Sequence, residues 1–151
     1  MSKRADQAVQ NFNDGCNCAQ SVLLAYADVL GLTQEQAAMV SVGFGGGMGR
    51  LRLHCGAFSA AVMLAGILEG AEGANKEHRP TTYARVQEIH RRFIERNGTI
   101  SCAALLGKAG VPEDPTPEER TPEYYAKRPC AGIIRQACEM LDEMLEETAH
   151  A

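Results

Sequence analysis

The sequence lacks a sustained run of basic residues and a long hydrophobic stretch. It has 15 lysines and arginines against 19 aspartates and glutamates, a formal charge of −4. Because phosphate backbones are bound by clustered Lys and Arg, we expect no nucleic-acid partner. The longest apolar stretch, from Val22 to Leu32, contains Asp28 and is shorter than the roughly 20 residues of a membrane span. We therefore expect no membrane insertion.

The start of the chain also lacks a hydrophobic leader. After Met-Ser-Lys-Arg the sequence continues with Ala-Asp-Gln-Ala-Val-Gln, whereas a secretory signal needs an apolar segment there. This predicts a cytoplasmic location, in which thiols are kept reduced. Permanent disulfides are uncommon in that setting, so the six cysteines need another explanation.

Strict alternation between apolar and polar residues, the pattern of a half-buried strand, is absent as well. The apolar residues are spaced as in helices, and 151 residues, 45% of them hydrophobic, suffice for one globular core. The sequence predicts a single all-α domain over residues 1–151, a bundle of about five to seven helices. A flexible or tightly turned glycine-rich loop, residues 43–49, precedes the central helix, residues 55–68.

Cap residues mark the expected starts of several helices. Asn17 with Gln20, and Thr33 with Gln36, have the spacing of a capping box, in which two side chains satisfy backbone groups reciprocally. Ser101 is placed to cap a short helical turn. Further helices are expected over residues 5–12 and 82–96 and from Pro129 onward.

A proline-rich connector is expected over residues 111–129, which hold five of the six prolines. The Thr-Pro pairs at 116–117 and 121–122 each suit the start of a short helical turn. The acidic residues of this connector, among them Glu113 and Glu118, predict a solvated face.

The last helix carries an apolar stripe of nearly heptad spacing: Ile133, Ile134, Ala137, Cys138, Leu141, Met144 and Leu145. This stripe suits packing in the bundle or against a second subunit. Self-association through this helix is therefore one expectation. Cys138 lies within the stripe and is expected to be a core residue.

Four cysteines stand at expected helix starts: Cys18, Cys55, Cys102 and Cys130. Unpaired N–H groups and the positive end of the helix dipole favour a thiolate over a thiol there, so we expect low pKa values. Their spacing matches neither a thioredoxin-type pair nor a zinc ribbon, so the folded bundle must unite them. Small buried hydrophobes are the alternative interpretation. Cys16 is left open between a resolving thiol and a turn residue.

These residues resemble a known family. The run Gly43-Phe-Gly-Gly-Gly-Met, then Cys55-Gly-Ala-Phe-Ser-Ala, with Cys18 upstream and Cys102 and Cys130 downstream, is similar to the C-GCAxxG-C-C family of small redox-active proteins. The resemblance implies a redox role for the four cysteines. Ala60 departs from the pattern, which has glycine there. A distant similarity to part of the split-Soret cytochromes raises haem, but the sequence has no Cys-x-x-Cys-His.

Three hypotheses follow. The first is a redox protein that cycles its thiols through disulfides, without a required cofactor, with an unknown redox partner and with Cys55 as the attacking thiol. The second uses the same four cysteines, Cys18, Cys55, Cys102 and Cys130, to bind an iron–sulfur cluster or zinc. The third is a helical self-association or interaction module whose cysteines only pack.

Two neighbouring features are given a structural interpretation. The glycine-rich loop, with Arg50 and Arg52 beside it, has the composition of a phosphate-binding loop, but no strand precedes it. We therefore expect a hinge that delivers Cys55 to the centre of the bundle. His54 is expected to be a solvated loop residue.

Overall fold

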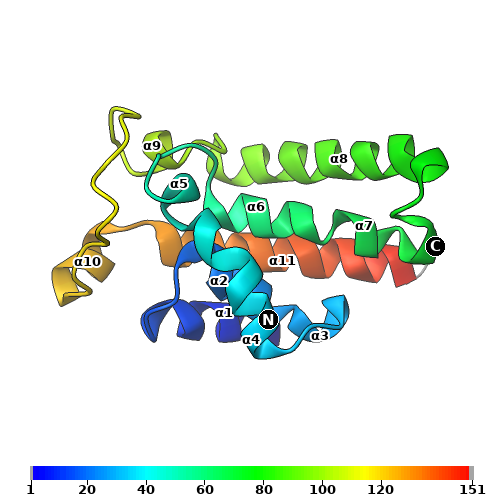
Figure 1. Ribbon diagram of the computed structural model, residues 1–151, viewed down its shortest axis with the longest axis horizontal. Helices are drawn as coiled ribbons and strands as arrows, with labels where there is room; N and C mark the ends of the chain where they lie inside the picture. The colour runs from blue at the N-terminus through cyan, green and yellow to red at the C-terminus, as the bar shows by residue number, and fades with distance from the viewer. Residues whose placement is uncertain (1, 150–151) are drawn as a thin grey trace.

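A computed structural model describes residues 2–149 of the chain, and it confirms the predicted all-α fold (Figure 1). No β-strand occurs within 2–149; an isolated antiparallel bridge joins His54 to Ser101. None of the helices in this range is both long and apolar enough to cross a membrane. The elements of the first half are α1 (Lys3–Asn13), α2 (Cys18–Ala25), α3 (Ala27–Leu30), α4 (Gln34–Ser41), η1 (Val42–Phe44) and α5 (Gly45–Met48). Those of the second half are α6 (Gly56–Met63), α7 (Ala65–Leu68), η2 (Gly70–Glu72), η3 (Lys76–His78), α8 (Arg79–Asn97), α9 (Cys102–Leu105), α10 (Pro122–Lys127) and α11 (Cys130–Ala149).

The predicted caps are present. The Asn17 side chain accepts a hydrogen bond from the Gln20 N–H, and the Asn17 N–H donates to the Gln20 side chain. Helix α2 therefore begins with a capping box. Thr33 and Gln36 form the same arrangement at α4. Ser101 caps α9 by accepting from the Ala104 N–H. These local signals fix where the cysteine-bearing helices α2 and α9 begin.

The core lies between α11 and the helices around it. α11 packs against α1, α2, α6 and α8, and α6 packs against α2 and α8. The apolar stripe of α11 is buried almost throughout, so the chain itself covers it, as the bundle alternative predicted. Tyr26 at the end of α2 donates its hydroxyl to the Cys138 carbonyl and to Asp142, fixing α2 against α11.

The predicted glycine-rich loop is a turn of left-handed backbone. Gly46, Gly47, Met48, Gly49 and Arg50 have φ values between 60° and 70° in succession. Glycine adopts this conformation freely, whereas each other residue costs about 1–2 kcal/mol. The left-handed turn reverses the chain between η1 and α6, as the hinge prediction requires.

The connector differs in part from its prediction. Thr121 caps α10, which starts with Pro122, so the second Thr-Pro pair does begin a short helix. The first pair does not, because residues 116–117 have no helical structure. In Figure 1, α5, α9 and α10 lie at one end of the molecule, near the starts of α6 and α11. The predicted helix starts that carry cysteine therefore meet at this end.

Candidate functional site

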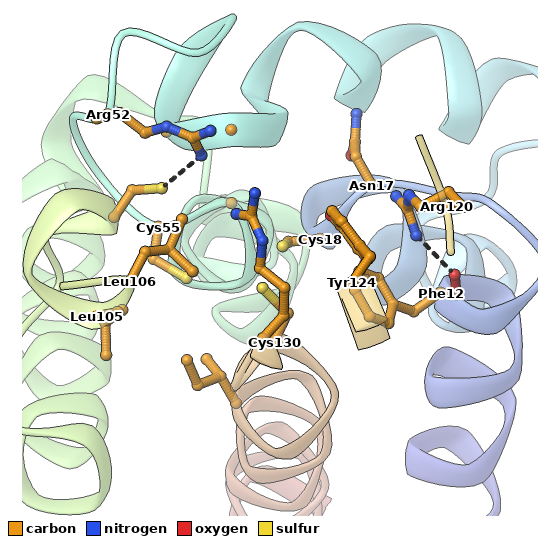
Figure 2. Close-up of a pocket in the computed structure, with 16 residues that line it drawn as sticks. Phe12, Asn17, Cys18, Arg52, Cys55, Leu105, Leu106, Arg120, Tyr124 and Cys130 are labelled. Atoms are coloured by element: carbon orange, nitrogen blue, oxygen red, sulfur yellow. Dashed lines mark hydrogen bonds between the residues drawn. The ribbon is translucent and has the colours of Figure 1, made fainter. Parts of the chain in front are cut away.

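All four helix-start cysteines line one cavity, which we call the cysteine cavity (Figure 2). Its volume is about 60 Å³, which is space for a few water-sized groups. The sulfur-bearing walls are Cys18, Cys55, Cys102 and Cys130, and three arginines, Arg52, Arg120 and Arg128, complete them. Apolar atoms from Phe12, Leu105, Leu106, Tyr124 and Ile133 supply much of the remaining surface. The fold thus brings together the cysteines that the sequence singled out.

A short backbone pairing brings Cys55 and Cys102 together. The Cys55 N–H donates to the Ile100 carbonyl and the Cys102 N–H donates to the Leu53 carbonyl, each at 2.7 Å. These bonds flank the bridge between His54 and Ser101. Because each cysteine stands at a helix start, the pairing places the starts of α6 and α9 side by side.

Gly56 lets α2 approach the start of α6. A Cβ atom at this position would lie 2.9 Å from the Ala19 nitrogen and 3.2 Å from the Cys18 Cβ. Real Cβ atoms essentially never approach a backbone nitrogen to that distance. A side chain here would push Cys18 away from Cys55, which gives the Cys55-Gly56 pair a physical reason.

Gly47 likewise allows a close approach, here between the left-handed turn and Cys102. A Cβ atom there would lie 2.6 Å from the Cys102 Cβ and 2.7 Å from the Leu53 nitrogen. The backbone of the left-handed turn therefore packs directly onto α9. The turn that reverses the chain also closes the cavity.

Arg52 follows the left-handed turn and reaches Cys102. Its side chain is buried, its φ is +60°, and its Nη1 donates to the Cys102 sulfur at 3.5 Å. Figure 2 draws this contact as a dashed line from Arg52. Glu113 accepts from Arg52 Nε and compensates the buried guanidinium charge. A non-glycine residue in left-handed backbone is strained. At Arg52 this strained conformation accompanies the contact between the guanidinium and the Cys102 thiol.

The sequence analysis missed two of the three arginines. Arg120 and Arg128 come from the proline-rich connector and its end. The Arg120 guanidinium lies 4.8 Å from the Phe12 ring centre and 4.7 Å from that of Tyr124. The Arg128 guanidinium also lies 4.7 Å from the Tyr124 ring centre. The signal that could have found them is the Tyr124-Tyr125 pair between Arg120 and Arg128.

The acidic residues of the connector are not simply a solvated face. Glu113 pairs with Arg52 and Lys108, and Glu118 pairs with Arg128 at 2.8 Å. Lys108 lowers the pKa of Glu113 to about 2; desolvation opposes this and Arg52 supports it, so Glu113 stays ionised at neutral pH. The connector therefore holds the cations of the cavity in place.

Cys130 is the cavity cysteine whose pKa is lowered. Hydrogen bonding with Cys18 lowers the pKa of Cys130 to about 7, and the positive charges of Arg128 and Arg120 act in the same direction, while burial opposes them. The same hydrogen bond, together with burial, raises the pKa of Cys18 well above its ordinary value. Of the two thiols, Cys130 is therefore the one whose surroundings favour the charged form.

The expectation that helix starts lower the pKa is wrong for Cys18 and Cys55. Burial raises the pKa of Cys55 to about 11, although the backbone N–H groups of Ala57 and Phe58 oppose it. The helix-dipole effect is real but modest, and loss of water around a charged sulfur outweighs it.

Cys138 and His54 lie where the sequence analysis expected them, and Cys16, which was left open, lies outside the cysteine cavity. Cys138 is fully buried in the core, and burial raises its pKa to about 12. Cys16 does not line the cysteine cavity, and its carbonyl accepts from Arg120. His54 is exposed and stacks its edge against Phe58. All six cysteines are unpaired thiols in the structure.

The donor set does not fit a single metal ion. Nowhere within residues 2–149 do three or more His, Cys, Asp or Glu side chains converge closely enough to hold one. A structural zinc site needs four such ligands in tetrahedral array. The four cysteines share a cavity but do not form such an array.

Comparisons with known proteins point in one direction. A family model described as "Putative redox-active protein (C_GCAxxG_C_C)" matches residues 16–144. An uncharacterised protein of Archaeoglobus fulgidus is 24% identical over 153 residues, which cover 96% of this chain and 95% of that protein. No solved structure gives a significant match.

Proposed function

Since the chain belongs to the C_GCAxxG_C_C family of redox-active proteins, we propose that its cysteine cavity carries out thiol–disulfide exchange. Cys130 is the attacking thiolate and Cys18 the resolving thiol. The observation that carries this proposal is one cavity lined by four cysteines and three arginines, in which the pKa of Cys130 is lowered and that of Cys18 is raised. Cys55 and Cys102 complete the proposed set of redox cysteines.

A pKa of about 7 suits an attacking thiol. The thiolate is the nucleophile, and the best attacking thiol has a pKa near ambient pH, because a lower pKa also lowers nucleophilicity. Cys55, with its pKa raised to about 11, is mostly protonated at neutral pH. The proposal therefore moves the attacking role from Cys55, where the sequence analysis placed it, to Cys130.

The reaction balances in two steps. The Cys130 thiolate attacks one sulfur of a disulfide substrate, forming a mixed disulfide and releasing the other half as a thiolate, which takes up a proton. Cys18 then loses its proton and attacks Cys130 in the mixed disulfide. The products are a Cys18–Cys130 disulfide and two substrate thiols; the protein gives up two electrons and the Cys18 proton, and the second thiol takes its proton from solvent. The reverse direction reduces the protein at the expense of a dithiol.

Two other functions are less well supported. A metal or iron–sulfur module using the same four cysteines requires ligands to converge, which those within residues 2–149 do not do for a single ion. A module with purely structural cysteines would surround them with apolar core, as around Cys138, whereas arginines line the cysteine cavity. Self-association through the stripe of α11 is disfavoured because the chain itself buries that stripe.

The test is to follow oxidation of the reduced protein by hydroxyethyl disulfide, a small neutral disulfide. Intact mass and peptide mapping of acid-quenched samples should show a Cys18–Cys130 disulfide in the wild type. Cys18→Ser should instead accumulate the mixed disulfide on Cys130. Metal content and absorption of anaerobically purified protein are recorded in parallel.

Cys138→Ser is the matched control, because it removes a thiol from the same helix and should leave the oxidation rate unchanged. Oxidation of Cys130→Ser at the wild-type rate would overturn the assignment. Stoichiometric iron and sulfide, or zinc, in the isolated protein would favour the metal-binding alternative instead.

A further inference from the structure

We propose that the substrate is a low-molecular-weight anionic disulfide, bound by a second cavity that is lined by four arginines and shares a wall with the cysteine cavity. The inference rests on the proposed exchange at Cys130 and adds the class of substrate. We call the second cavity the arginine vestibule. Its volume is about 250 Å³, and its cationic residues are Arg50, Arg52, Arg120 and Arg128.

The two cavities are continuous in their walls. Arg52, Arg120 and Arg128 line both, as do Asn17, Gly46 and Tyr124. The inner cavity has only about 60 Å³, so a substrate can place little more than its reacting sulfur there. The rest of the molecule must then lie in the vestibule, among the arginines.

The vestibule has more positive than negative charge. Glu118 is the carboxylate in its lining, and it is engaged by Arg128 at 2.8 Å. Arg52 is engaged by Glu113. Arg120 forms no ion pair with any carboxylate in the described part of the chain; its guanidinium donates to the carbonyls of Phe12 and Cys16 and to the Tyr125 hydroxyl.

Arg50 is a further cation of the vestibule, and one of its donor atoms lacks a hydrogen-bond partner within residues 2–149. Its side chain is only 16% exposed, and its nearest carboxylate oxygen, on Glu113, is 3.6 Å away. Its Nε is buried and has no hydrogen-bond partner within residues 2–149. A buried donor without a partner is costly, and an anionic ligand would supply one.

The chemistry of the ligand follows from these two walls. A disulfide sulfur must reach Cys130, and a carboxylate or sulfonate a few bonds away would reach Arg120 or Arg50. Bidentate contacts between guanidinium and carboxylate are among the stronger charge-assisted hydrogen bonds. The three arginines that line both cavities also favour the thiolate of Cys130, so charge recognition and thiol activation share part of one set of residues.

The experiment compares three disulfides of similar size: dithiodiglycolate, which is anionic, hydroxyethyl disulfide, which is neutral, and cystamine, which is cationic. The second-order rate of Cys130 oxidation is measured for each and divided by the rate of the same disulfide with a small free thiol. We expect the normalised rate to be about tenfold higher for dithiodiglycolate than for hydroxyethyl disulfide, and lowest for cystamine. Added salt should reduce the preference.

Four variants test where the preference arises. Arg50→Gln and Arg120→Gln should each lower the ratio of anionic to neutral rates by about threefold to tenfold. Arg120→Lys keeps the charge and should retain most of the ratio, even though it loses hydrogen bonds to backbone carbonyls. Arg91→Gln removes an exposed arginine that pairs with Glu88 and Glu95, away from both cavities, and should leave the ratio unchanged.

Using a ratio separates recognition from thiol activation, because a change in the reactivity of Cys130 affects all three disulfides alike. Equal normalised rates for the three disulfides would overturn the anionic substrate while leaving the exchange reaction intact. Failure of all three to oxidise Cys130 would overturn the proposed function itself. Equal loss of the ratio in Arg120→Lys and Arg120→Gln, with no loss in Arg50→Gln, would show that Arg120 acts only through structure and would overturn the vestibule.

Discussion

Cys130 and Cys138 lie on the same helix, α11, about two turns apart, and both are buried. The pKa of Cys130 is lowered to about 7, mainly by hydrogen bonding with Cys18, whereas burial raises that of Cys138 to about 12. The first faces a cavity with three arginines, and the second lies fully inside the core, eight residues further on.

The difference shows that burial alone does not decide the state of a thiol. Loss of water opposes the charged form at both positions. At Cys130 a donor and nearby cations compensate for it, and at Cys138 the nearby Asp142 carboxylate opposes the charge further. The proposed reactive end of the molecule is therefore set apart by its hydrogen bonds and charges and not by exposure.

Alkylation is the most sensitive way to test this contrast. The lowered pKa of Cys130 favours its thiolate near neutral pH, while a pKa of about 12 leaves Cys138 protonated, so the two alkylation rates should differ by roughly 10⁴-fold. Iodoacetamide at pH 7, followed by peptide mapping, should modify Cys130 in the native protein and Cys138 only after unfolding. Modification of both at similar rates in the folded state would remove the contrast.

The same substitution, glycine to alanine, should have opposite effects on stability at Gly56 in α6 and at Gly132 in α11. Gly56→Ala places a methyl group 2.9 Å from the Ala19 nitrogen, so we expect a loss of about 2–3 kcal/mol in the free energy of unfolding. Gly132→Ala, on α11, meets nothing within 4 Å and should gain about 0.5–1 kcal/mol from helix propensity. Denaturant unfolding measures both. Equal effects would show that Gly56 is not required for close approach.

The hydrogen bond to Cys18 should set the pH dependence of Cys130. Below pH 7 the Cys130 thiolate takes up a proton, so its alkylation rate should fall about tenfold per pH unit. Cys18→Ala removes the donor and should raise the pKa of Cys130, lowering the rate at pH 7 by about tenfold. Cys18→Ser, which keeps a donor, is the control. An unchanged midpoint in Cys18→Ala would assign the lowered pKa to the arginines alone.

Two methionines should respond oppositely to the same small change. Met48 has left-handed backbone with φ +70°, so Met48→Gly should raise the free energy of unfolding by about 0.5–1 kcal/mol. Met39 is exposed on α4, and Met39→Gly should lower it by about 1 kcal/mol. Thermal unfolding of the two variants checks this. A loss at both positions would argue that the Met48 side chain has a packing role.

The sequence predicts much of the fold because the signals involved are local. Asn17, Thr33 and Ser101 cap the helices that their spacing predicts, since a cap depends on residues within one turn. The pattern of cysteines at helix starts likewise predicts which four sulfurs share the cavity.

The rest depends on contacts between distant segments. Arg120 and Arg128 reach the cavity because the connector folds back over Phe12, and the local grouping of arginine with tyrosine does not tell where that segment packs. The raised pKa of Cys55 comes mainly from burial by the finished core. The left-handed backbone of Met48 and Arg50 runs against local preference and requires the surrounding structure to hold it.

The most direct measurement is an NMR titration of the protein labelled with ¹³C at the cysteine Cβ atoms, from pH 5 to pH 11. We expect the Cys130 signal to titrate near pH 7, while Cys18, Cys55 and Cys138 remain protonated until well above pH 9. Titration of Cys130 together with Cys138 at high pH would contradict the lowered pKa of Cys130 on which the proposed exchange depends.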